Sequence, residues 1–365
     1  MTAAVPMDER ARRPLRNAPR AATGGQLIVW AALLLAAAAV MSLSIGSTGI
    51  TLDALPRVIT AWITGRTDAS VAREQLVLLD IRLPRLLLGL FVGAGLAVSG
   101  AMMQGLFRNP LADPGLVGVS AGAALAAVAT IAFGNGLAAV WTKIMGVYAL
   151  PFSAFAGGVA TTAILVMIVA RQGQLATATL LLAGIALGAL STALMGLIAF
   201  ASDDRELRDL TLWMLGSLSG ASWPKVVAVL PFALLVGLGL PRLVRALNGL
   251  LLGEAEAFHL GVDVERMKRQ IILITAAAVG AAVAVAGIVG FVGIIVPHLV
   301  RLVAGPDHRI VLPASALLGG ALVLTADVAA RMALRPAELP LGVVMALIGA
   351  PIFLHLVVKR GMGAG

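Results

Sequence analysis

The residue types that most often do chemistry are sparse in this chain and do not cluster. It has no cysteine, which excludes disulfides, thiolate metal sites and thiol catalysis. No HExxH motif occurs, and the four histidines have no metal-ligand spacing: His259, His298, His308 and His355. A GxxxxGK[ST] loop is also missing, so the chain lacks that route to nucleotide hydrolysis. These absences argue against an enzyme.

The composition instead predicts a membrane protein. Of the 365 residues, 60% are hydrophobic and 12% are charged, and the mean hydropathy is +1.00. An ordinary soluble domain carries about 25% charged residues, most of them on its surface. This excludes a soluble enzyme, a nucleic-acid-binding module and a disordered linker. The net charge of +9 comes from basic residues between apolar runs, where lipid is the expected partner and nucleic acid is not.

Long charge-free stretches predict the spanning helices. A helix needs about 20 apolar residues to cross the hydrocarbon, and a central charge costs about 2.5–3.5 kcal/mol. The stretches are 27–52, 86–107, 114–142, 144–170, 172–202, 226–241, 270–300, 310–326 and 339–358. The stretch 270–300 contains Gly287, Gly290 and Gly293 and is long enough for two helices. We therefore predict an all-α polytopic membrane protein with ten transmembrane helices.

Basic residues at both ends predict the topology. Residues 1–26 form an arginine-rich tail that precedes a retained first helix, and the chain ends soon after Lys359 and Arg360. An even number of helices places both ends on one side, and positive charge favours the cytoplasm. We therefore expect a multi-pass protein of the bacterial inner membrane with both termini cytoplasmic. Its parts would be the tail 1–26 and a permease domain 27–360.

A short polar segment between apolar runs is the clearest feature for a partner to bind. Within residues 248–267, the run Glu254–Leu260 predicts a short amphipathic helix that Gly261 would close as a C-cap. Its expected apolar contact residues, which lie between charged side chains, are Ala255, Phe258 and Leu260. One interpretation is a loop helix that lies on the membrane. The other is a docking helix that fits a groove on a soluble motor.

Acidic residues within the spans are few, and Asp327 is the clearest one. A carrier driven by protons or sodium usually places acids or broken helices near mid-membrane. We therefore expect a transport pathway whose energy comes from another subunit. Hydropathy alone leaves a secondary carrier possible.

Several motifs in order along the chain resemble the FecCD family of permeases. They include Arg82-Leu-Pro-Arg85, the run from Asn109 to Ser120, Gly290 to Arg301, Asp307-His308-Arg309 and Ala326 to Arg331. The resemblance covers roughly residues 50–360. It implies the type II importer fold of ATP-binding-cassette transporters, with ten helices per subunit. It also implies a second copy of the chain, two ATPase subunits that hydrolyse ATP inside, and a periplasmic binding protein outside.

The resemblance also implies roles for individual residues. The coupling segment, which the ATPase would contact, comprises Gly253, Glu254, Ala255, Phe258, Leu260 and Gly261. Arg82, Arg85 and Arg331 would be exposed arginines that receive acidic residues of the binding protein, although interfacial arginines also anchor headgroups. The cytoplasmic gate would lie at Asn109, Leu111, Thr177 and Ala178.

The cargo is suggested by residues 203–220, which are most similar to the haem-importing branch of that family. Haem is flat and apolar with two carboxylates, which suits an arginine at the mouth and an adaptable apolar route. The expected route residues are Arg205, Arg208, Met195 and Met214. Alternatively, both arginines pair with neighbouring acids in a solvated loop. We expect no permanently bound cofactor or metal, haem as the transported ligand, and iron-siderophore or cobalamin as alternative cargo.

Overall fold

A computed structural model describes residues 21–46, 54–65, 69–136, 138–171, 177–334 and 336–361. Within these ranges every regular element is a helix. Only the last residues of the predicted tail 1–26 are described, and they begin the first helix. The rest of the tail lies outside the described residues.

Ten helices form the body of the structure. In chain order they are α1 (Ala21–Ser44), α4 (Leu83–Leu106), α5 (Val119–Phe133), α7 (Ala149–Ala170), α8 (Thr177–Ala201), α10 (Trp223–Leu250), α12 (Val264–Ala286), α13 (Val292–Ala304), α14 (His308–Ala333) and α15 (Leu341–Gly361). Shorter elements join them: α2 (Leu55–Thr64), α3 (Ala69–Gln75), the π-helix η3 (Leu76–Arg82), the 3₁₀ helices η4 (Pro114–Val117) and η5 (Gly146–Tyr148), α6 (Ala139–Met145), α9 (Asp204–Met214) and α11 (Glu254–His259).

The prediction of ten apolar helices is confirmed. Among the described residues, seven helices are long and apolar enough to cross a membrane, and α5, α13 and α15 are shorter apolar helices. The stretch 270–300 divides as predicted, because α12 ends at Ala286 and α13 begins at Val292. Gly287 and Phe291 both take a positive φ in the break, at 69° and 66°. Glycine tolerates that conformation without steric cost, which explains why the helix ends there.

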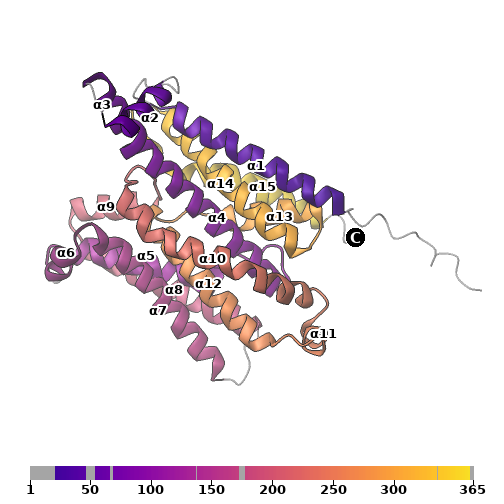
Figure 1. Cartoon of the computed structure of the whole chain (residues 1–365). Coiled ribbons are helices and arrows are strands. Elements are labelled where there is room, and N and C mark those ends of the chain that lie inside the picture. Colours follow the sequence, from indigo (N-terminus) through magenta and orange to yellow (C-terminus); the bar gives the residue numbers. More distant parts are fainter. Residues whose placement is uncertain are drawn as a thin grey trace, which may run out of the picture.

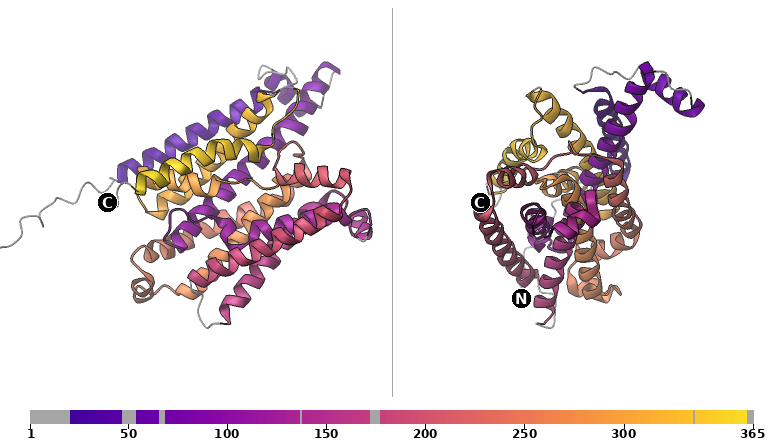
Figure 2. Two further views of the ribbon diagram at one scale, coloured as in Figure 1. Left: turned by 180° about the vertical axis from the view of Figure 1, so that it is seen from behind. Right: turned by 90° about the vertical axis from the view of Figure 1, so that its left-hand side faces the viewer.

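The bundle has two distinct ends. Figure 1 shows α11 at one end, with α2, α3, α6 and α9 at the opposite end. The start of α1 and the end of α15 both lie on the side of α11, as the view from behind confirms (Figure 2). We call these the α11 end and the α9 end. An even number of crossings explains why both described chain ends meet at one of them.

Helix α4 lies at the centre, packed against α10, α12, α13 and α14. Two glycine contacts bring it close to its neighbours. A Cβ on Gly93 would collide with the carbonyl of Gly319 in α14, and a Cβ on Gly100 would collide with the carbonyl of Gly293 in α13. Small residues of this kind let helix backbones approach closely in lipid. The centre of the fold is therefore tightly packed and holds the functional segments at both ends.

Candidate functional site

The predicted coupling segment forms a short helix that projects at the α11 end (Figure 1). Helix α11 ends at His259 and is closed by Gly261 at φ 82°. The N–H of Val262 donates to the carbonyl of Ala257 at 3.0 Å, and that of Gly261 donates to Phe258 at 2.9 Å. These bonds are the pattern of a Schellman C-cap.

The apolar side chains of this segment face away from the bundle. Phe258 is 69% exposed and Leu260 is 65% exposed, and Ala255 is also exposed. Ala257, by contrast, is fully buried and anchors the helix against the body. Aromatic and aliphatic side chains in this position are the kind that a partner's groove buries.

An ion pair holds the coupling segment to the start of α12. The ammonium of Lys268 lies 2.8 Å from a carboxylate oxygen of Glu254 and 3.5 Å from one of Glu265. Lys268 is buried, while both carboxylates are partly exposed. The ion pair therefore joins α11 to α12 in addition to the connecting chain.

A second network joins the end of α10 to α14 beside the coupling segment. The amide of Asn248 donates to Asp307 at 2.7 Å, and its oxygen accepts the backbone N–H of His308 at 2.9 Å. The ring Nε2 of His308 lies 3.2 Å from the guanidinium of Arg301, which also donates to the carbonyl of Ala101 in α4 at 3.0 Å. The end of α10 is thus tied to α4, α13 and α14.

Asp307 lies in the loop before α14. Partial burial acts to raise the pKa of this carboxyl, but the hydrogen bonds from the Arg309 N–H and the Asn248 amide, together with the Arg309 charge, outweigh it. The pKa of Asp307 is therefore below its ordinary value.

The three predicted docking arginines gather at the α9 end with two carboxylates. Arg85 binds Asp327 at 2.8 Å and Glu338 at 2.9 Å, and Arg331 binds the same Asp327 at 3.1 Å. We call these residues, together with Arg82, the arginine cluster.

The arginine cluster also caps the end of α1. Arg331 donates to the carbonyl of Ile45 at 3.1 Å, and Arg82 donates to the carbonyls of Leu43 and Ser44. The last carbonyls of a helix lack partners within it, and cations satisfy them well. The cluster therefore ties α1, α4 and α14 together.

The expectation that these arginines are exposed is wrong in this structure. Arg82 is 3% exposed, and Arg85 and Arg331 are each 8% exposed. The physical reason is that Asp327 and Glu338 supply carboxylates from inside the chain. Only Glu338 reaches the surface to any extent, with a side chain that is 36% exposed.

The predicted gate residues lie where the chain leaves α4 and where it enters α8. Asn109 is exposed, and its side chain accepts the N–H of Leu111 at 3.0 Å. Ala178 is exposed near the start of α8, and the side chain of Thr177 lies outside the described residues. The loop after α4 continues into η4, which packs so closely on α8 that a Cβ on Gly184 would collide with the carbonyl of Leu116.

The predicted route residues are divided between surface and core. Arg205 and Arg208 are exposed on α9 and form no ion pair within the described residues. Of the acids around them, Asp203 and Glu206 form a capping box at the start of α9, with bonds of 2.7 and 3.2 Å. The alternative in which the arginines pair with these acids is therefore not observed. Met214 is 38% exposed.

Met195, by contrast, is buried in a small cluster with Ala124, Val128 and Leu210. In this conformation its side chain cannot touch a passing cargo. It packs α8 against α5 and α9.

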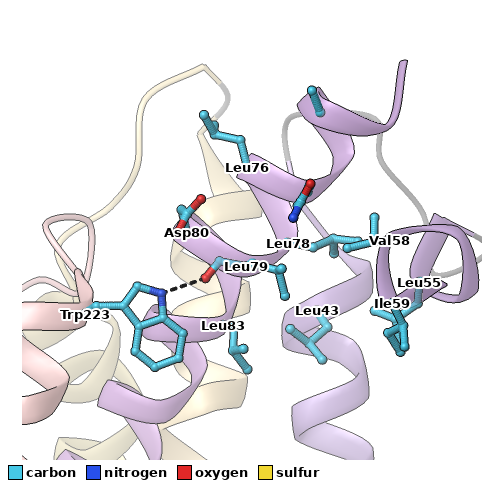
Figure 3. A pocket seen from close by; sticks show the side chains of 12 residues that line it. Leu43, Leu55, Val58, Ile59, Leu76, Leu78, Leu79, Asp80, Leu83 and Trp223 are labelled. Atoms are coloured by element: carbon cyan, nitrogen blue, oxygen red, sulfur yellow. Dashed lines mark hydrogen bonds between the residues drawn. The ribbon is translucent and has the colours of Figure 1, made fainter. Parts of the chain in front are cut away.

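One cavity that the structure describes holds none of these residues. It has a volume of about 900 Å³ at the α9 end and is lined mainly by apolar side chains of α1, α2, η3 and α10. Figure 3 shows Trp223 reaching across from α10, where its Nε1 donates to the carbonyl of Leu79 at 3.1 Å. The cavity offers one carboxyl group, Asp80, at its edge.

Comparison with known proteins identifies the chain. The FecCD transport family matches it over residues 34–359. The chain belongs to this family.

FecCD relatives carry different cargo. The chain is 45% identical to the hemin transport system permease HmuU of Yersinia pestis over 305 residues, which cover 82% of this chain and 87% of the relative. It is also 45% identical to the cobalamin import permease BtuC of Halobacterium salinarum over 290 residues, with 80% and 75% covered. The vitamin B12 import permease BtuC of Vibrio parahaemolyticus is 47% identical over 287 residues, with 78% and 84% covered.

The FecCD fold is also known from a solved structure. An inward-facing conformation of a metal-chelate type ABC transporter matches with a TM-score of 0.77 and 34% identity, covering 92% of this chain and 99% of that one. The chain is therefore a polytopic permease subunit of the ABC importer class, whose ATPase and substrate-binding protein are separate partners.

Two groups of residues in this FecCD chain escaped the sequence analysis. Asn248 and Arg301 join the network at the α11 end, and Lys225 lines a cavity at the α9 end. Arg301 is the last residue of the Gly290–Arg301 motif, so the sequence indicated that it is important but could not indicate its partners in the fold. The sequence signal for Lys225 was a lysine near the start of an otherwise apolar helix, which indicates a polar site there.

Proposed function

We propose that this FecCD permease imports haem with energy from a partner ATPase. The observation that supports haem most directly is a pair of exposed arginines on α9, Arg205 and Arg208, which form no ion pair with any residue that the structure describes. An iron-porphyrin carries two carboxylates, and guanidinium groups bind carboxylates through matched hydrogen bonds. The 45% identity to a hemin permease agrees with this cargo.

The orientation proposed places the α11 end in the cytoplasm of a bacterium, with the chain in the inner membrane. Positive charge near the chain ends favours that side. The α9 end would then face the periplasm, where a substrate-binding protein delivers cargo.

The assembly proposed contains two copies of this chain and two ATPase subunits. Helix α8 is a suitable contact between the copies, because it is largely exposed and Gly188 and Gly196 have open space beside them. Glycines spaced along one helix allow a second helix to approach closely. The gate residues Asn109, Leu111, Thr177 and Ala178 would then lie near the axis at the cytoplasmic end.

Each ATPase would bind the coupling segment around Phe258 and Leu260. Their exposure is the supporting observation, because large apolar side chains on a helix that projects into water usually mark a contact with a partner. The ion pair between Lys268 and Glu254 would pass the movement to α12.

The binding protein would dock at the arginine cluster by exchange of partners. The cluster has three arginines and two carboxylates, so it carries one surplus positive charge. Glu338 is the more exposed of its carboxylates, and an acidic residue of the binding protein could replace it on Arg85. Such an exchange would favour orientation and association rate.

The test is uptake into proteoliposomes that hold the complete complex with ATP inside. We expect haem to accumulate, and excess unlabelled haem to suppress uptake of labelled haem. Accumulation of cobalamin or an iron-siderophore with no accumulation of haem would overturn the cargo assignment.

Cobalamin is the second candidate cargo. The specific observation that favours it is the similarity to two cobalamin permeases, at 45% and 47% identity. The same uptake experiment separates the two cargoes, since each is offered alone and then in competition.

A further inference from the structure

A separate cavity at the α9 end contains a lysine that the function above does not use. Its volume is about 380 Å³, and its wall comes from η5, the start of α7, α9, the loop after α9, the first turn of α10 and the end of α12. Ligand sites in proteins range from about 300 to 1,000 Å³. The cavity is therefore large enough for part of a sizeable ligand.

Lys225 is half-buried in this cavity and has no ion pair or hydrogen bond within the described residues. Its Nζ lies over the backbone of Gly220, since a Cβ placed there would be 3.0 Å from it. Withdrawing an ammonium from water without a partner costs free energy, so such a group gains from an incoming anion.

Two serine hydroxyls accompany the ammonium. Ser217 Oγ donates to Ser219 Oγ at 2.8 Å, and the N–H of Ser219 donates to Ser217 Oγ at 3.0 Å. Ser219 is exposed and lines the cavity, so its hydroxyl group can contact a ligand. An ammonium and a hydroxyl together suit an oxyanion.

The loop that carries these groups is held in place before any ligand binds. Ser217 donates its N–H to the carbonyl of Ala286 at 2.8 Å, and Gly216 accepts the N–H of Leu341 at 2.9 Å. The loop is thus fastened to both α12 and α15. A pre-organised site loses less entropy when it binds.

The remaining wall is apolar and includes Leu212, Trp213, Leu150 and Val285. A free inorganic anion would leave these surfaces unused. The combination therefore favours an oxyanion attached to an apolar body over a small, fully hydrated ion.

We propose that Lys225 and Ser219 bind an oxyanion carried on an apolar molecule, and that this oxyanion is a carboxylate of the cargo as it enters the α9 end. The assignment of this oxyanion to the cargo rests on the proposed function. A lipid phosphate offers the same chemistry at the membrane surface, and the experiment distinguishes the two sources.

The experiment measures binding to the complete complex in a maltoside detergent, which contains no phosphate or carboxylate. The probes are iron mesoporphyrin, its dimethyl ester and dioleoylphosphatidate. The variants are K225Q, which removes the charge, and K225R, which keeps it. K143Q is the matched control, because Lys143 is an exposed lysine on α6 at the same end.

We expect K225Q to weaken binding of the porphyrin dicarboxylate about tenfold, the loss of one charge-assisted contact. K225R and K143Q should bind it as the wild type does, and the dimethyl ester should bind wild type and K225Q equally. Equal binding of the dicarboxylate by wild type and K225Q would overturn the proposal that Lys225 binds a carboxylate of the cargo.

The phosphatidate arm tests the oxyanion site itself. If K225Q no longer binds phosphatidate but binds the porphyrin as the wild type does, the site binds lipid, and the proposal that it binds a carboxylate of the cargo is overturned. If K225Q changes neither ligand, the oxyanion site is overturned. A wild-type complex that binds no porphyrin would refute haem as cargo, and loss of phosphatidate in K225Q would still support the site.

Discussion

The two ends of the bundle hold arginines in different ways. At the α9 end, Arg85 lies between two carboxylates, Asp327 and Glu338. At the α11 end, Arg301 has no carboxylate partner among the described residues and donates to the carbonyl of Ala101 beside His308. Carboxylates can be exchanged for those of a partner, whereas neutral acceptors within the backbone cannot. The first arrangement suits a surface that binds and releases, and the second suits a fixed joint that transmits movement.

The largest loss of stability should follow removal of the Asp327 charge, which Arg85 and Arg331 share. D327N leaves Arg85 and Arg331 in a buried cluster with only Glu338 as a carboxylate, which should cost about 3–5 kcal/mol of folding stability. Thermal unfolding of the purified permease in detergent measures the loss. D209N is the control, because Asp209 is exposed on α9. An unchanged melting temperature for D327N would mean that the cluster does not stabilise the fold.

At the α11 end, N248A should have a smaller effect. It removes a partner of Asp307, which keeps the Arg309 N–H, and the partner of the His308 N–H. A buried polar group left without a partner, here the His308 N–H, costs about 1–3 kcal/mol. Hydrogen exchange should quicken in residues 305–310 with little change elsewhere. Exchange that quickens equally across the whole bundle would show that the network stabilises the global fold and is not a local joint.

The sequence was enough to predict the ten helices, because each contains a charge-free apolar run and the break after Ala286 contains glycine. The coupling helix was also predicted to within a residue, since its acidic start and Gly261 are local signals. The burial of Arg85 was not predictable in the same way. Its partners lie 242 and 253 residues away in the chain, and only the packing of α4 on α14 brings them together.

The ion pair of the coupling segment should contribute less to stability than either buried network. In E254Q, Lys268 keeps Glu265 at 3.5 Å, and Glu254 is itself partly exposed. Because Lys268 keeps a second carboxylate and Glu254 is partly exposed, we expect a loss of no more than about 1 kcal/mol. Thermal unfolding with E256Q as the control measures it, and a loss as large as that of D327N would contradict the contrast between the two ends.

The smallest effect concerns pH. Because the pKa of Asp307 is held below its ordinary value of about 3.9, the carboxylate stabilises the α11 end at all higher pH values. The stabilisation is lost only as the pH falls through the lowered pKa. Hydrogen exchange of the Arg309 N–H, corrected for its intrinsic rate, should show constant protection from pH 8 to about pH 5. A loss of protection within that range would contradict the assignment.

The central claim is that a partner ATPase drives this permease through the exposed residues of the coupling segment. The most direct test is ATP-driven haem uptake by the complete complex carrying F258A and L260A together. L238A on α10 is the control, since Leu238 is 72% exposed on a different helix. The account predicts a folded permease with uptake reduced at least tenfold, because two exposed anchors are lost from the contact. Uptake at the wild-type rate would contradict it.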